Sequence, residues 1–144
     1  MPIESINPST GKTIRTYNEH SADEVNAIIG RVARAQRRWR DVGFGERSSR
    51  MREVGLLLRE RGDTYATLMA SEMGKPVVQG RAEAEKCAWS CDYYAEMAKE
   101  FLAAEEVATA AVRSRVVFEP LGVILASCHG IFRSGRFFDF SYPL

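Results

Sequence analysis

One stretch decides the fold of this 144-residue chain: Val116-Val117-Phe118-Glu119-Pro120-Leu121-Gly122-Val123-Ile124-Leu125-Ala126. Its first half belongs to a strand expected at Val112–Glu119. Pro120-Leu121-Gly122 predicts a turn, and the last four residues have the unbroken apolar character of a buried strand in a parallel sheet. After Ala126 the pattern ends, because residues 127–140 have neither helical nor strand periodicity. We therefore expect an organised segment at 1–126 and a poorly ordered tail at 127–144.

Before this stretch the sequence predicts a hairpin. Short strands are expected at Glu4–Ile6 and Lys12–Tyr17, and the second alternates and is rich in β-branched residues. Between them, Asn7-Pro8-Ser9-Thr10-Gly11 combines a fixed proline φ with a glycine that tolerates positive φ. This segment predicts a tight turn.

Four helices are expected between the hairpin and the decisive stretch. The first starts with a capping box at Ser21-Ala22-Asp23-Glu24 and ends near Asp41 or Val42, before Gly43. The others are expected at Glu46–Arg61, from Asp63 as N-cap to Met73, and at Pro76–Ala104, with Gly62 and Gly74 as stops.

Apolar residues at helical spacing predict the face that each helix buries. These residues are Val25, Ile28, Ile29, Val32, Ala35 and Trp39 in the first helix; Met51, Val54, Leu57 and Leu58 in the second; Tyr65, Leu68, Met69 and Met73 in the third; and Ala84, Cys87, Ala88, Cys91, Ala95, Ala98, Phe101 and Leu102 in the fourth.

Composition narrows the class of protein. The net charge is +1, and no run of 18 apolar residues or signal-peptide pattern is present, so we expect a cytoplasmic protein without membrane or nucleic-acid partners. Three cysteines without framework spacing fit a reducing compartment. An arginine-rich face on the first helix could bind nucleic acid, but without interleaved aromatic residues a solvated face is favoured. This face consists of Arg31, Arg34, Arg37, Arg38 and Arg40.

Few residues are candidates for chemistry. Cys87 and Cys91 share a helix face, but a metal site needs two further ligands and an intrahelical disulfide is at the limit of reach, so packing is favoured. Cys128 and His129 are adjacent, yet no third group orients them as nucleophile and base. His20 is expected at the surface.

Acidic residues and nucleotide motifs give no stronger signal. For Glu83 and Glu85, beside Lys86, solvated charges are favoured over an acid–base pair. The chain has no GxGxxG, Walker A or HExxH pattern. We therefore expect it to contain no catalytic, cofactor-binding or metal-binding residue.

Three segments in order resemble the N-terminal part of NAD(P)-dependent aldehyde dehydrogenases: Ile6–Gly11, Ser71–Pro76 and Phe118–Ala126. Cys87–Ala95 is most similar to the succinate-semialdehyde dehydrogenase branch. The resemblance implies an α/β fold, with an N-terminal β-hairpin, a four-helix layer and the first strands of an incomplete parallel-sheet dinucleotide-binding domain. It also implies that residues 107–122 belong to the family's oligomerisation hairpin, through which a homo-oligomer or a paralogue could assemble.

The resemblance implies a reaction for the full-length enzyme. A thiolate adds to the aldehyde, which for this branch is succinic semialdehyde. Hydride then passes to NAD or NADP, and water releases the acid. The family's catalytic Cys, general-base Glu and oxyanion-stabilising Asn have no counterpart here. The chain alone is therefore expected to be inactive and to bind neither cofactor tightly.

The genetic code suggests why the tail departs from the family. One permitted coding of Ser127–Phe140, read from its third base, gives M-P-W-N-F-P-F-W-Q-V-F-R-F, the kind of segment that follows this strand in aldehyde dehydrogenases. Loss of one base after the Ala126 codon would produce the tail. A truncating frameshift is therefore expected; a genuine divergent C-terminus, or a sequencing error in a normal gene, is the alternative.

A second function class is a non-catalytic interaction module. In that case the helical layer would pack on a full-length paralogue, with the helix stripes and the Val116–Phe118 strand as its interface. Co-purification with an intact dehydrogenase would distinguish it from an inactive remnant.

Overall fold

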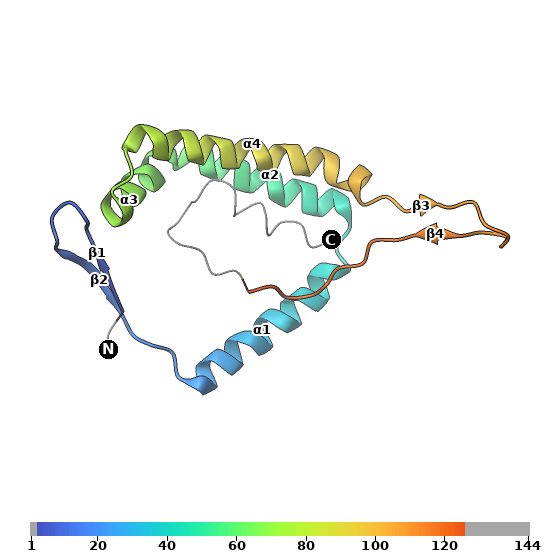
Figure 1. The fold of residues 1–144 in the computed structure, drawn as a ribbon, viewed down its shortest axis with the longest axis horizontal. Coiled ribbons are helices and arrows are strands. Elements are labelled where there is room, and N and C mark those ends of the chain that lie inside the picture. Colours follow the sequence, from blue (N-terminus) through green and yellow to red (C-terminus); the bar gives the residue numbers. More distant parts are fainter. Residues whose placement is uncertain (1–2, 126–144) are drawn as a thin grey trace.

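The computed structural model describes residues 3–125, which form a hairpin, four helices and a thin two-stranded ribbon (Figure 1). The strands are β1 (Ile3–Ile6), β2 (Thr13–Tyr17), β3 (Glu105–Glu106) and β4 (Arg115–Val116). The helices are α1 (Ala22–Arg40), α2 (Phe44–Glu60), α3 (Gly62–Met73) and α4 (Val77–Phe101). The hairpin and all four helices lie within a few residues of the predicted positions.

The hairpin closes through its predicted turn. β1 and β2 are antiparallel, with Ile3 opposite Tyr17. Gly11 has a φ of 69° and its N–H donates to the carbonyl of Asn7 at 2.8 Å. The Ser5 hydroxyl donates to Glu72 at 3.1 Å, which ties the hairpin to the end of α3.

The core lies where α4 packs along α2 and across α3. The side chains buried here are Leu58, Ala66, Met69, Ala84, Cys87, Ala88, Cys91 and Ala95. The predicted stripe on α4 is confirmed up to Ala95, whereas Val54 and Leu57 on α2, Leu68 and Met73 on α3, and Phe101 at the end of α4 are exposed. Their faces have too few neighbours in a layer only one helix deep.

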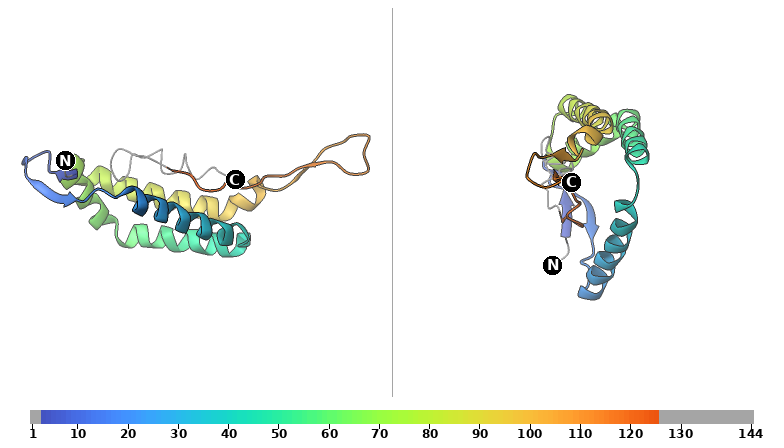
Figure 2. Two further views of the ribbon diagram at one scale, coloured as in Figure 1. Left: turned by 90° about the horizontal axis from the view of Figure 1, so that it is seen from below. Right: turned by 90° about the vertical axis from the view of Figure 1, so that its right-hand side faces the viewer.

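The α1 helix corrects the prediction most clearly. Its capping box is confirmed, since the Glu24 N–H donates to Ser21 Oγ and the Ser21 N–H donates to the Glu24 carboxylate. Yet α1 has no buried residue, although its apolar stripe was expected to face the core. The helix diverges from the α2–α4 layer, as the end-on view shows (Figure 2). Its stripe therefore lacks a partner among residues 3–125.

Two further predictions about the helices have different outcomes. Asp63 is not the N-cap of α3, because the helix begins at Gly62 without a side-chain cap and Asp63 pairs with Arg81 instead. Gly74 does end α3: it has a φ of 68°, a left-handed conformation that glycine adopts without steric cost.

The expected parallel sheet is not present in residues 3–125. β4 lies within the predicted strand, but it pairs antiparallel with β3 to form a ribbon that projects beyond the helices (Figures 1 and 2). Residues 121–125 form no strand, and Val123, Ile124 and Leu125 are 49%, 42% and 92% exposed. A parallel strand needs hydrogen-bonding neighbours, which this part of the chain does not supply. The predicted tail at 127–144 lies outside the described residues.

Candidate functional site

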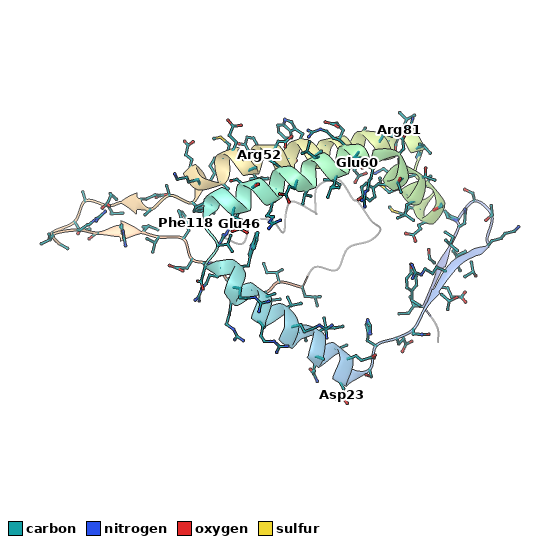
Figure 3. The ribbon with its side chains drawn as sticks, turned by 180° about the vertical axis from the view of Figure 1, so that it is seen from behind. Asp23, Glu46, Arg52, Glu60, Arg81 and Phe118 are labelled. Atoms are coloured by element: carbon teal, nitrogen blue, oxygen red, sulfur yellow. The ribbon has the colours of Figure 1, made fainter. Side chains whose placement is uncertain are left out.

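A cavity of about 390 Å³ lies at the corner between α1 and α2. It is closed on its third side by Phe118, which lies beside the start of α2 (Figure 3). Arg47 organises this corner. Its Nη2 donates to the carbonyls of Trp39 and Arg40 at 3.1 and 2.8 Å, and its guanidinium lies 5.7 Å from the Trp39 ring centroid.

These contacts give Arg47 a structural role. The last carbonyls of a helix have no intrahelical donors, and a cation at this end also interacts favourably with the helix dipole. Arg47 supplies both effects to α1 from the first turn of α2. Arg47 was not among the residues singled out from sequence, where its only signal is an arginine in the first turn of a helix that starts at Gly43-Phe44.

Replacing Arg47 with Met should destabilise the chain by about 1–2 kcal/mol, because two charge-assisted hydrogen bonds to α1 carbonyls are lost. The free energy of unfolding in urea measures this effect. Arg50→Met is the matched control: Arg50 is also on α2, but its ion pairs with Glu46 and Glu53 are at the surface. The control should change stability by less than about 0.5 kcal/mol. Equal effects of the two substitutions would contradict this role for Arg47.

A buried ion pair joins the turn after α3 to α4. Glu83 is 4% exposed, and the Lys75 ammonium contacts its Oε2. Apart from this ion pair, neither Glu83 oxygen has a hydrogen-bond partner within residues 3–125. Among residues 3–125, Lys75 is therefore the group that offsets the cost of burying this carboxylate.

The position of Glu83 corrects the expectation of a solvated charge. Glu83 follows Gly80 by three residues and precedes Cys87 by four, so it lies at the edge of the packed face of α4. Glu85 does lie at the surface, where it pairs with Arg59 of α2 at 3.0 Å. The two carboxylates therefore have separate cationic partners, and neither is arranged with the other as an acid–base pair.

The thiols of Cys87 and Cys91 are held in the core. They are 3% and 1% exposed, and burial raises the pKa of both, with a smaller contribution to Cys87 from its neighbour Cys91. A nucleophilic cysteine needs an accessible thiolate, and these environments disfavour it. The other predicted pair, Cys128 and His129, lies outside the described residues.

The raised thiol pKa values predict a loss of stability at alkaline pH. Thiols in the unfolded chain ionise near pH 8.5, whereas Cys87 and Cys91 ionise higher when folded. The contribution of these two thiols to the free energy of unfolding is therefore fully present below about pH 8, and it is lost as pH rises through the folded pKa values. The urea midpoint should be lower at pH 9.5 than at pH 7, and the double variant Cys87→Ala/Cys91→Ala should reduce this difference. An unchanged difference in the double variant would contradict this cause.

Other candidate groups are dispersed. His20 is exposed, and its Nδ1 lies 3.8 Å from Oε2 of Glu24. Hydrogen bonds from Ser21 lower the pKa of the Glu24 carboxyl. Within residues 3–125 no cluster of three or more His, Cys, Asp or Glu side chains could hold a metal ion. None of the helices in this part of the chain is long and apolar enough to span a membrane.

The lining of the corner cavity does not favour a nucleotide cofactor. The corner cavity contains Arg47, but both of its Nη2 hydrogen bonds are to backbone carbonyls, and Arg40 pairs with Asp41 at 3.3 Å. The acidic Glu119 lines the same cavity and would repel a phosphate. Neither of these features forms a cradle of backbone N–H groups for a dinucleotide.

Comparison with known proteins identifies the fold. The sequence model of the aldehyde dehydrogenase family matches residues 1–127. The chain belongs to the aldehyde dehydrogenase family. The match spans the hairpin, the four helices and the ribbon, and it confirms the resemblance carried by the three sequence segments.

Individual relatives support the predicted branch. The chain is 41% identical over 143 residues to a probable succinate-semialdehyde dehydrogenase [NADP(+)] of Synechocystis, covering 99% of this chain and 32% of that protein. It is 36% identical over 122 residues to the Escherichia coli succinate semialdehyde dehydrogenase [NAD(P)+] Sad, covering 85% of this chain and 26% of that protein.

A solved structure agrees with these relatives. The fold is similar to that of succinic semialdehyde dehydrogenase from Streptococcus pyogenes in complex with NADP+, with a TM-score of 0.74 and 27% identity. The match covers 79% of this chain and 25% of that protein chain. The chain thus spans about a quarter to a third of the proteins that it matches.

Proposed function

We propose that this chain is the N-terminal scaffold of an NAD(P)-dependent aldehyde dehydrogenase that oxidises succinic semialdehyde to the carboxylic acid. The observation that carries the proposal is the 41% identity to the Synechocystis relative, which is named for this substrate and for NADP(+). The E. coli relative is named for NAD(P)+, so NAD and NADP both remain cofactors of the proposal. The free thiols of Cys87 and Cys91 fit a reducing cytoplasm.

In this proposal the chain contributes scaffold and no chemistry. The thiols of Cys87 and Cys91 are buried, and the lining of the corner cavity does not favour a dinucleotide. The resemblance to the family implies that the catalytic Cys, the general-base Glu and the oxyanion-stabilising Asn lie beyond residues 1–126. We therefore propose that the chain alone is inactive and binds neither NAD nor NADP tightly.

A fusion tests the proposed activity. Residues 1–126 are joined to the segment of the Synechocystis relative that follows its counterpart of Ala126, and NADPH formation from succinic semialdehyde is followed at 340 nm. Turnover within about tenfold of the intact relative is expected, because the scaffold matches it at 41% identity. A soluble fusion that oxidises no aldehyde would contradict the proposal.

We also propose that the reading frame shifts after Ala126. The family match ends at residue 127, which supports this proposal, whereas the Synechocystis alignment covers 99% of the chain, as a genuine divergent C-terminus would allow. Resequencing the gene around codons 126 and 127 decides between them. Codons for Pro-Trp-Asn in the neighbouring frame are expected; their absence would contradict the shift, and a restored frame would indicate a sequencing error.

A second candidate is a non-catalytic module that packs on a full-length paralogue. The projecting β3–β4 ribbon favours it, since Val107, Val112, Val116 and Val117 are exposed there. In the scaffold proposal the same ribbon would pair within a homo-oligomer. Co-purification with an intact dehydrogenase tests the module, and a clean monomer in its presence would count against it.

A further inference from the structure

The α4 helix presents an exposed pair of aromatic rings that the scaffold role does not explain. Trp89 and Tyr93 are 59% and 39% exposed, and their rings stack with centroids 5.5 Å apart and an interplanar angle of 19°. We call these two residues the α4 aromatic pair. Tyr93 also lies 6.0 Å from the ring of Phe101, which is itself exposed. Because tryptophan and tyrosine are enriched in protein–protein interfaces and among the residues that dominate binding, the pair indicates a contact surface.

The packing of α4 fixes the direction in which the aromatic pair points. Successive residues of a helix are about 100° apart, so Trp89 and Tyr93, two residues before and after Cys91, both lie on the side opposite to Cys91. Cys91 is 1% exposed and faces α2, since a Cβ added at Gly55 would lie 3.5 Å from its own Cβ. The α1 helix leaves the layer from the α2 side (Figure 2). The aromatic pair therefore points away from the packed side of α4.

Charged residues flank the pair symmetrically. Lys86 lies five residues before Cys91 and Glu96 five residues after it, so they border the aromatic pair on opposite edges. Both side chains are exposed, and neither has an ion-pair partner within residues 3–125. The order along this face is thus cation, aromatic, aromatic, anion, and the same order reversed is complementary to it.

We propose that this face of α4 binds the same face of a second copy of the chain, with the two α4 helices antiparallel. A two-fold contact of this kind brings together residues that lie equally far from its centre in opposite directions. Trp89 then meets Tyr93 of the second copy, and Lys86 lies level with Glu96 of the second copy. Each of these contacts occurs twice across the interface.

The charges select the antiparallel arrangement. Parallel helices would place Lys86 beside Lys86 and Glu96 beside Glu96 of the second copy, and juxtaposed like charges oppose association. In the antiparallel arrangement Glu85 lies on the same edge as Glu96 of the second copy. Glu85 is already paired with Arg59 at 3.0 Å, so its negative charge is offset within its own chain.

Sedimentation equilibrium of the full 144-residue chain tests the proposal. A contact limited to one face of the 25-residue α4 helix is at the small end of specific interfaces, so a monomer–dimer equilibrium with a dissociation constant on the order of 10 µM is expected. Trp89→Ala should raise this constant at least about tenfold, because the ring lies at the centre of the contact. Circular dichroism checks that the variant retains wild-type helix content. A chain that is still monomeric at about 1 mM would overturn the proposal.

Exchange of the two charges tests the orientation. Lys86→Glu places like charges at both copies of the contact and should raise the dissociation constant by about fivefold. Adding Glu96→Lys restores opposite charges between the copies and should return the constant to within about twofold of the wild-type value. Lys99→Glu is the control, because Lys99 is exposed on α4 outside this face. No recovery in the double variant, or equal weakening by Lys99→Glu, would contradict the antiparallel contact.

A substitution in the β3–β4 ribbon separates the α4 contact from association through the ribbon. Val112 is fully exposed between β3 and β4, and Val112→Asp should leave the dissociation constant within about twofold of the wild-type value. Association that Val112→Asp abolishes and Trp89→Ala leaves intact, whether in dimers or in larger assemblies, would place the contact on the ribbon and overturn the proposal. The proposed aldehyde oxidation does not depend on the result, because this contact needs neither substrate nor cofactor.

Discussion

Replacement of Lys75 by Met is expected to destabilise the helical layer by about 3–5 kcal/mol, because it leaves the buried Glu83 carboxylate without its cationic partner. Folded domains are stable by only about 5–15 kcal/mol. The loss is therefore a large share of the total stability, and the urea midpoint should fall sharply. Far-UV circular dichroism during urea titration at pH 7 measures it.

Two further variants separate the buried charge from the loss of the lysine itself. Adding Glu83→Gln to Lys75→Met removes the uncompensated charge and should recover more than half of the lost stability. Lys99→Met replaces an exposed lysine on α4, the helix that carries Glu83, and should change stability by less than about 0.5 kcal/mol. Equal stability of Lys75→Met and Lys99→Met would show that the ion pair contributes nothing.

Gly80→Ala is expected to destabilise the contact between α3 and α4 by about 1–2 kcal/mol. A Cβ at position 80 would lie 2.8 Å from the Cα of Ala66 and 3.0 Å from its Cβ, so the two helices would have to move apart. Overpacking of this kind typically costs about 1–3 kcal/mol, partly offset by the higher helix propensity of alanine.

The control for this substitution is Gly45→Ala in the first turn of α2, where an added Cβ meets nothing within 4 Å. Alanine there should stabilise the chain, by no more than about 1 kcal/mol. Urea midpoints that move in opposite directions are expected for the two variants. A stabilising Gly80→Ala would mean that the helices do not approach as closely as described.

Local sequence was sufficient to predict the elements themselves. The Ser21–Glu24 capping box and the left-handed Gly74 are short-range features whose hydrogen bonds lie within one turn of the helix. The α4 stripe was also predictable up to Ala95, because small residues repeat at helical spacing on the side that packs against α2 and α3.

The errors arose where a partner distant in sequence decides the outcome. Periodicity predicts that Ile29 has an apolar side, but it does not say whether another element covers that side. Glu83 is buried because Lys75 approaches it from a preceding turn, and Arg47 caps a different helix from its own. The parallel sheet was expected from the apolar run at 123–126, which by itself does not provide a neighbouring strand.

The central claim is that the chain supplies scaffold and the remaining part of an aldehyde dehydrogenase supplies chemistry. Steady-state NADPH or NADH formation by the purified 144-residue chain, with succinic semialdehyde and each cofactor in turn, tests it most directly. A rate equal to that of a heat-denatured sample is expected. Turnover that is abolished in a Cys87→Ala or Cys91→Ala variant would contradict it, because a thiol assigned to packing would then be the nucleophile.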